Sequence, residues 1–165
     1  MQQVVIGLGG NIGDTKSFLA QAIRLIEQEI GVIKLKSSLY QTKAWGVENQ
    51  PDFTNMVVQL ETVLSPEEVL KACLMIEQKI GRDRSGKNKW AERIIDIDVL
   101  FYEDEIINTP KLTLPHSYIH ERNFVLYPLE EILPGLVHPI LLKTVRELKE
   151  TTKDNQAVLL LKDKI

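Results

Sequence analysis

Two aspartates, Asp96 and Asp98, are separated by a single isoleucine in a run of β-branched residues at 94–102. Side chains alternate between the two faces of a strand, so both carboxylates project from one face and their apolar neighbours from the other. Aspartate is a poor strand former, and adjacent like charges repel unless a cation neutralises them. Mg²⁺ commonly binds one or two carboxylates together with substrate phosphates. The pair therefore indicates a metal site for phosphoryl transfer, the alternative being the polar outer face of a strand.

A basic segment precedes the two aspartates. Residues 78–93 contain six lysines and arginines and two acidic residues, so this segment has a net charge of +4 and the rest of the chain −7, which sum to −3. A local basic patch on an acidic protein suits a small anion better than a long polyanion. We therefore expect phosphate near this segment and no nucleic-acid partner, the alternative being a solvated loop with incidental charge.

Two glycine-rich segments approximate phosphate-binding motifs but lack the required context. In the segment Gly7–Gly13 the last glycine falls one residue late for a dinucleotide fingerprint, and no acidic residue ends the next predicted strand. We expect a tight turn there, braced by the side chain of Asn11. The segment 81–88 resembles a Walker A loop, but it ends in asparagine and runs from a helix into a strand, the reverse of a P-loop. Its basic residues could still hold phosphate.

The histidines and the single cysteine exclude several other kinds of site. His116 and His120 are four residues apart, but a serine follows the first, where a zincin needs glutamate, and a proline precedes it. We expect a loop with His116 near an anion, no zinc site, and His138 at the surface. Cys73 is the one cysteine, which excludes an internal disulfide and a multi-cysteine metal site.

Length and composition indicate an ordinary globular protein. The chain has 165 residues, 44% hydrophobic and 26% charged, enough for a core without disulfides or structural metal. We predict one domain, 1–165. The start of the chain has no basic or long apolar signal-peptide region, and its longest aliphatic stretch is too short to cross a bilayer. We therefore predict a cytoplasmic protein with no membrane partner and no obligate protein partner.

The apolar periodicity predicts the order β-α-β-β-α-β over the first 102 residues. Strands are expected at 4–8, 32–40, 53–63 and 94–102, and helices at 14–31, capped by aspartate, and at 65–81, opened by Ser-Pro-Glu-Glu. Short strands at 106–107 and 112–114, helices at 122–132 and 141–150, and a strand at 158–162 are expected to follow. This order predicts the α+β class, with a ferredoxin-like antiparallel sheet that carries C-terminal helical and strand additions.

The segment Lys89–Leu100, KWAERIIDIDVL, resembles the signature of the 6-hydroxymethyl-7,8-dihydropterin pyrophosphokinase family. The resemblance covers nearly the whole chain, with further colinear matches at 9–14, 38–42, 50–55, 77, 81–84, 114–116 and 120–126. It implies a ferredoxin-like fold and transfer of diphosphate from ATP to the hydroxymethyl group of the pterin, giving AMP and the pterin diphosphate for folate biosynthesis.

The same resemblance implies roles for individual residues. Asp96 and Asp98 would hold two Mg²⁺ ions, and Arg82 and Arg93 would act beside them in catalysis. The nucleotide site would be formed by Arg84, Lys89, Trp90, Val99, Lys111, Thr113, His116 and Arg122. The pterin pocket, in which two aromatic rings sandwich the flat heterocycle, would be formed by Thr42, Ala44, Trp45, Phe53, Asn55 and Phe124. Judged by residue type alone, the two phenylalanines would be assigned to the core.

Some positions depart from the family pattern. Ala91 and Glu92 replace a commoner Gly-Pro, and Lys89 stands where arginine is common. Leu74 and Ser117 occupy positions where some members have a polar residue and a tyrosine. These differences affect single ATP contacts rather than the reaction.

Two other functions are compatible with the residues alone. A nucleotidyltransferase or cyclase on the same sheet would use the same two-metal chemistry but would release pyrophosphate. A ferredoxin-like RNA-binding module would have no turnover, but the acidic net charge and the absence of an RNP-like aromatic run disfavour it.

Overall fold

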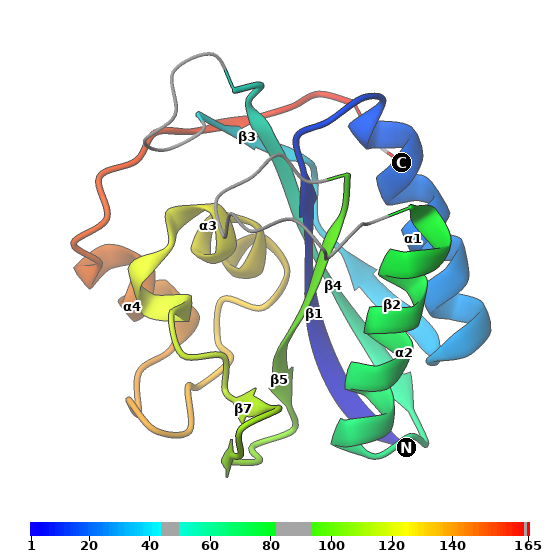
Figure 1. Ribbon diagram of the computed structural model, residues 1–165. Helices are drawn as coiled ribbons and strands as arrows, with labels where there is room; N and C mark the ends of the chain where they lie inside the picture. The colour runs from blue at the N-terminus through cyan, green and yellow to red at the C-terminus, as the bar shows by residue number, and fades with distance from the viewer. Residues whose placement is uncertain (44–49, 82–93, 164) are drawn as a thin grey trace.

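A central antiparallel sheet organises the protein (Figure 1). The computed structural model describes residues 1–43, 50–81, 94–163 and 165. The sheet has the order β5-β1-β4-β3-β8, and β2 also pairs with β4. Its strands are β1 (Gln2–Gly10), β2 (Val32–Lys36), β3 (Tyr40–Thr42), β4 (Phe53–Thr62), β5 (Asp96–Tyr102) and β8 (Val158–Leu160). The order confirms the predicted ferredoxin-like fold of the α+β class.

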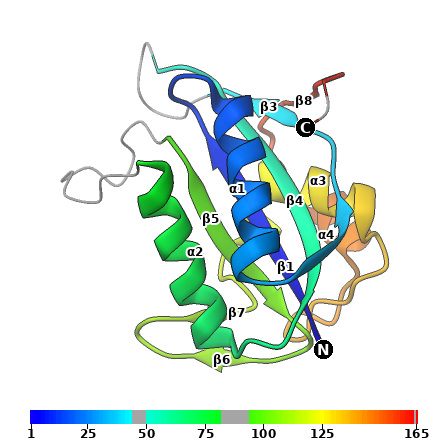
Figure 2. The ribbon, with the colours of Figure 1, turned by 90° about the vertical axis from the view of Figure 1, so that its right-hand side faces the viewer.

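Two helices cover each face of the sheet. Helices α1 (Thr15–Glu29) and α2 (Pro66–Ile80) lie on one face, and α3 (Asn123–Ile132) and α4 (Val145–Thr151) lie on the other, as Figures 1 and 2 show from two sides. A separate two-stranded sheet, β6 (Ile107–Asn108) and β7 (Thr113–Leu114), and a short 3-10 helix, Ile119–Glu121, connect β5 to α3. Among the described helices, none is long and apolar enough to cross a membrane.

Alternation along the central strand β1 produces two apolar layers. Val4, Ile6 and Leu8 pack with the inner residues of α1 and α2 in one buried cluster. Val5 packs on the opposite face with residues of α3 and α4 in a second cluster. The two-residue period of a strand accounts for this division. The second face also carries the candidate site.

The ends of the first two helices follow their predicted caps. The Asp14 side chain accepts the backbone N–H of Ser17 at 3.1 Å at the start of α1. Ser65 and Glu68 form a reciprocal capping box at the start of α2, and Gly81 ends that helix with a φ of +107°, which glycine adopts without strain. The helix predicted at 141–150 begins later, at Val145, because Thr144 and Glu147 form a capping box there.

The single strand predicted at 32–40 is wrong in one respect, because the structure divides it into β2 and β3. The Glu131 carboxylate of α3 accepts the backbone N–H of Ser38 at 3.0 Å, the Ser38 hydroxyl at 2.8 Å and the Tyr40 hydroxyl at 2.8 Å. These bonds hold the segment between β2 and β3 against α3. Ser37 in this segment still bonds to Val57 of β4, but the Val57 N–H donates to the Ser37 hydroxyl and not to a backbone carbonyl. Glu131 therefore fastens α3 to the start of β3.

The side chain of Asn11 braces the turn after β1, as predicted, through a hydrogen bond to a distant residue. The Asn11 side-chain amide donates a hydrogen bond to the Pro51 carbonyl at 3.1 Å, forty residues along the chain. The amide therefore connects the turn to the segment that enters β4.

His138 is buried, so the prediction of a surface position is wrong. The residue is 4% exposed, and its ring lies edge-on to Phe101 with ring centroids 5.7 Å apart. Its Nδ1 atom accepts the backbone N–H groups of Ile140 and Leu141 at 3.3 and 3.2 Å. The turn after His138 therefore closes over the ring. Burial lowers the pKa of His138, and the nearby His120 lowers it further.

We expect His138 to make the protein less stable as the pH is lowered below about 6.5. A histidine with a lowered pKa in the folded state binds its proton more readily when unfolded, so its contribution is complete above the unfolded pKa of about 6.5 and is lost below it. The variant His138→Asn keeps an acceptor near Nδ1 but cannot titrate. We expect urea unfolding at about pH 7.5 and about pH 5.5 to show a smaller pH difference in this variant than in the wild type. An equal difference in both proteins would contradict this assignment.

Candidate functional site

Three strands place candidate residues in one row across the sheet. Gly9 of β1 pairs with Asn55 of β4 on one side and with Asp96 of β5 on the other. Directly opposed residues of antiparallel strands project from the same face. Asn55, predicted for the pterin pocket, and Asp96, predicted to bind metal, therefore lie on one face with a glycine between them.

The glycine leaves room for the asparagine side chain. A Cβ atom built on Gly9 would lie 2.3 Å from Asn55 Oδ1, far inside van der Waals contact. The Asn55 Nδ2 atom lies 3.5 Å from Thr42 Oγ1, and both side chains are buried. Thr42 itself pairs with Phe53 across β3 and β4. Four of the residues predicted for the pterin pocket and the metal site thus share this face.

Asp96 and Asp98 occupy the same face of β5, as the alternation predicts. Both are partly exposed, whereas Ile95, Ile97 and Val99 are buried in the layer under α1 and α2. Val99 was predicted to contact nucleotide, but its side chain points into that layer. Any nucleotide contact at this position therefore uses its backbone.

The two carboxylates suit a hard divalent cation. They are oxygen donors two residues apart on one strand face, and they keep access to solvent. Oxygen ligands of this kind, with substrate phosphates completing the coordination, are typical of Mg²⁺ sites.

Glu77 of α2, for which no role was predicted, approaches β5 from behind the aspartate pair. Its carboxylate accepts the backbone N–H of Ile97 at 2.8 Å, and the residue is 1% exposed. The signal for this residue was present in the sequence: Glu77 lies on the apolar stripe of α2 that contains Cys73, Ile76 and Ile80. An acidic residue on a buried stripe needs a partner, which only the fold identifies.

His116 and Arg122 lie within electrostatic reach of each other near the start of α3. The His116 backbone N–H donates to the Leu100 carbonyl at 2.9 Å, which fixes His116 beside β5. Burial lowers the pKa of His116, the Arg122 charge lowers it further, and Asp96 acts in the opposite direction. His116 therefore lies within electrostatic reach of both a predicted metal ligand and a predicted ATP contact.

The Arg122 guanidinium also lies over aromatic rings. It is 5.0 Å from the ring centre of Tyr118 and 5.6 Å from that of Phe124, which are cation–π distances. Phe124 is partly buried against the cluster under α3 and α4. The structure therefore brings one predicted nucleotide residue beside one predicted pterin residue.

The remaining predicted residues either lie at exposed positions near β7 or fall outside the described part of the chain. Lys111 and Thr113 are exposed beside and within β7. Seven predicted residues lie at 44–49 and 82–93, outside the described part of the chain: Ala44, Trp45, Arg82, Arg84, Lys89, Trp90 and Arg93.

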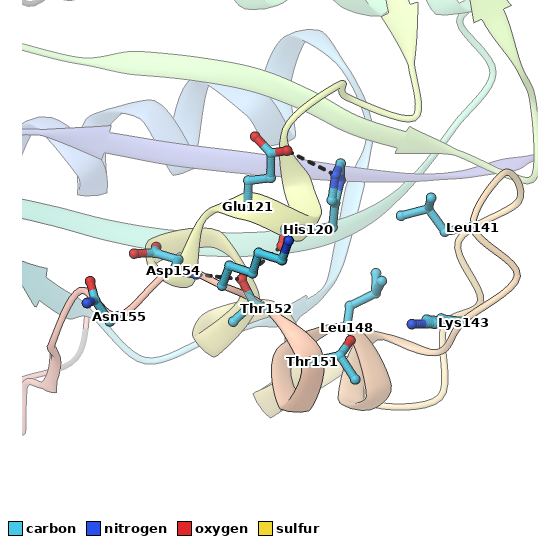
Figure 3. A pocket seen from close by; sticks show the side chains of 10 residues that line it. His120, Glu121, Leu141, Lys143, Leu148, Thr151, Thr152, Asp154 and Asn155 are labelled. Atoms are coloured by element: carbon cyan, nitrogen blue, oxygen red, sulfur yellow. Dashed lines mark hydrogen bonds and ion pairs between the residues drawn. The ribbon is translucent and has the colours of Figure 1, made fainter.

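A separate cavity of about 660 Å³ lies between the 3-10 helix, α4 and the segments flanking α4 (Figure 3). Of the predicted site residues that the structure describes, none lines it. Its charged side chains have opposite signs, with Lys143 and Lys153 against Glu121 and Asp154, and His120 Nε2 lies 3.4 Å from Glu121. This mixture favours no single class of ligand.

Comparison with known proteins identifies close relatives. The family model described as 7,8-dihydro-6-hydroxymethylpterin-pyrophosphokinase matches residues 5–134. The 2-amino-4-hydroxy-6-hydroxymethyldihydropteridine pyrophosphokinase of Aquifex aeolicus is 42% identical over 149 residues, covering 90% of this chain and 91% of the relative. The protein of the same name from Bacillus subtilis is 43% identical over 128 residues, covering 77% and 75%.

A solved structure with a similar fold is that of Plasmodium falciparum HPPK-DHPS. It superposes with a TM-score of 0.73 at 19% identity, covering 90% of this chain and 44% of that chain. This chain thus spans under half the length of the structural relative. The similarity supports the fold alone.

Replacing Gly9 should disturb Asn55 selectively. In Gly9→Ala the new Cβ would displace the Asn55 amide, so we expect affinity for a dihydropterin to fall about tenfold or more, the scale of one lost buried hydrogen bond, with ATP affinity nearly unchanged. Equilibrium titrations with each ligand measure this. The control is Gly135→Ala, where nothing lies within 4 Å of the new atom. Equal losses for both ligands would contradict the selective effect.

Proposed function

Because the chain belongs to the 7,8-dihydro-6-hydroxymethylpterin-pyrophosphokinase family, we propose that it transfers the pyrophosphoryl group of ATP to the hydroxymethyl group of the dihydropterin, a step of folate biosynthesis. The structural observation that carries the proposal is the row of Asn55, Gly9 and Asp96 across three paired strands. It supports a pterin held beside the predicted metal ligands on one face of the sheet.

The pterin end of the site has polar and aromatic components. Asn55 and Thr42 are buried polar side chains that can pair with the donors and acceptors on the edge of a heterocycle. Phe53 and Phe124 are only partly buried, which supports a role as pocket walls over one as core residues. Aromatic rings stack well on flat heterocycles.

The phosphate end of the site is formed by Asp96, Asp98, His116 and Arg122. We propose that the aspartates hold two Mg²⁺ ions, which would neutralise charge on the transferring phosphates. Arg122, oriented by the rings of Tyr118 and Phe124, supplies a fixed positive charge for the triphosphate. His116, whose pKa is lowered by burial and by the Arg122 charge, can donate a hydrogen bond from its ring to a phosphate oxygen.

The residues at 44–49 and 82–93 keep the roles predicted from the family resemblance. Arg82 and Arg93 would contact the transferring phosphates, Arg84, Lys89 and Trp90 would line the nucleotide site, and Ala44 and Trp45 would close the pterin pocket. Lys111, Thr113 and the backbone of Val99 would complete the nucleotide site. A single domain and a cytoplasmic location also stay predictions.

In the proposed reaction the hydroxymethyl oxygen attacks the β-phosphorus of ATP. The new O–P bond forms as the bond from the β-phosphorus to the oxygen bridging to the α-phosphate breaks, so AMP leaves and the hydroxyl proton is released to solvent. Positioning and electrostatic stabilisation supply most of the catalysis in phosphoryl transfer. The chain contributes the alignment of the pterin with the triphosphate.

The test is one incubation of the protein with ATP, Mg²⁺ and 6-hydroxymethyl-7,8-dihydropterin. We expect AMP and a diphosphorylated pterin, identified by chromatography and mass. Release of pyrophosphate would instead identify a nucleotidyltransferase or cyclase, and no turnover would favour a binding module.

Asp96→Asn should abolish most activity without unfolding the protein. Asparagine retains the size of the side chain but removes the charge that attracts Mg²⁺, and the repulsion from Asp98 is relieved. We expect turnover to fall by several orders of magnitude, while thermal unfolding shows equal or greater stability. Near-normal turnover would show that the metal site lies elsewhere.

A further inference from the structure

Glu77 is a carboxylate with almost no contact with water, directly behind the two aspartates. Its exposed fraction is 1%, and its Oε1 atom accepts the N–H of Ile97, the residue between Asp96 and Asp98, at 2.8 Å. Burying a carboxylate costs free energy unless hydrogen bonds or charges compensate. An apolar residue would suit the stripe of α2 better, so the acid at this position indicates a specific purpose.

The bond also occupies an open position of the sheet. β5 is the edge strand beside β1, so alternate backbone N–H groups of β5 point away from the sheet. The Ile97 N–H is one of these, and Glu77 of α2 takes the place of a missing strand neighbour. The direction of the backbone at Ile97 determines how the side chains on either side of it project, so this single bond acts on both aspartates.

The surroundings place negative charges close together. Burial, together with the charges of Glu77 and Asp98, raises the pKa of the Cys73 thiol to about 12. Glu77 and Asp98 therefore both lie within electrostatic reach of the same sulfur atom.

We propose that Glu77 is a positioning residue, which holds β5 through the Ile97 amide so that Asp96 and Asp98 present their carboxylates together to a divalent cation. This inference rests on the proposed function only in assigning metal binding to the aspartate pair. Partners that orient the ligands of a metal site commonly contribute about 10–100-fold to metal affinity or activity.

Three substitutions separate the hydrogen bond from the charge. Glu77→Ala removes both. Glu77→Gln keeps an oxygen acceptor without the charge. Glu77→Asp keeps the charge, but its side chain is one methylene group shorter, so its oxygens lie farther from the Ile97 N–H. Glu67→Ala, at an exposed position in the first turn of the same helix, removes an equal charge and serves as the matched control.

Two measurements need no turnover. The first is hydrogen exchange of the Ile97 amide, and the second is Mn²⁺ affinity in the presence of a non-hydrolysable ATP analogue. We expect faster Ile97 exchange and a loss of Mn²⁺ affinity of about 10–100-fold in Glu77→Ala and Glu77→Asp, with near wild-type values in Glu77→Gln and Glu67→Ala. In turnover assays, the Mg²⁺ concentration for half-maximal rate should rise by a similar factor while KM for the pterin stays constant.

Several outcomes would overturn the inference. Faster Ile97 exchange with unchanged Mn²⁺ affinity would leave Glu77 a purely structural role. Loss of affinity in Glu77→Gln despite a protected amide would assign the effect to charge. If Glu77→Ala does not fold, the contrast between the Glu77→Asp and Glu77→Gln variants decides between the outcomes.

Two further outcomes concern the proposed function. Absence of AMP formation by the wild type would refute the proposed function but leave both measurements valid. Mn²⁺ affinity that is unaffected by Asp96→Asn would refute the metal site itself.

Discussion

The register of β1 against its two neighbours is the constraint on which the candidate site depends. Because side chains alternate along each strand and opposed residues share a face, the pairings of Gly9 with Asn55 and with Asp96 place two different ligand-binding functions on one surface. A slip of one residue would turn each of these side chains into the opposite apolar layer. The buried residues at alternate positions, Ile6 and Leu8, prevent that slip, so the core under α1 and α2 stabilises the site on the other face.

Local patterns predicted the parts of the fold that depend on neighbouring residues. The Asp14 cap, the Ser65 capping box and the shared face of Asp96 and Asp98 all follow from spacings of a few residues. The errors arose where a distant residue determines the outcome. Glu131 divides the strand predicted at 32–40 from 93 residues away, and Phe101 helps to bury His138.

The candidate site shows the same division. The residue types and spacing of the aspartate pair were enough to predict a metal site. The pterin residues were identified only through the family resemblance, because Asn55 and Thr42 are common residue types in ordinary strands. The role of Glu77 required the fold, since its partner is a backbone N–H that no sequence pattern reveals. Residue type can suggest what a side chain does, but the position of a buried acid behind a strand is a property of three-dimensional packing.

The attachment of α3 to β3 by Glu131 has a consequence for how a ligand is received. Thr42 lies on β3 and Phe124 on α3, so the carboxylate that binds Ser38 and Tyr40 joins two walls of the proposed pterin pocket. Walls joined in this way keep their separation in the absence of ligand, and the loss of freedom needed to shape them occurs during folding. This end of the site is therefore preorganised, so ligand affinity there is not reduced by the entropy of ordering these two elements.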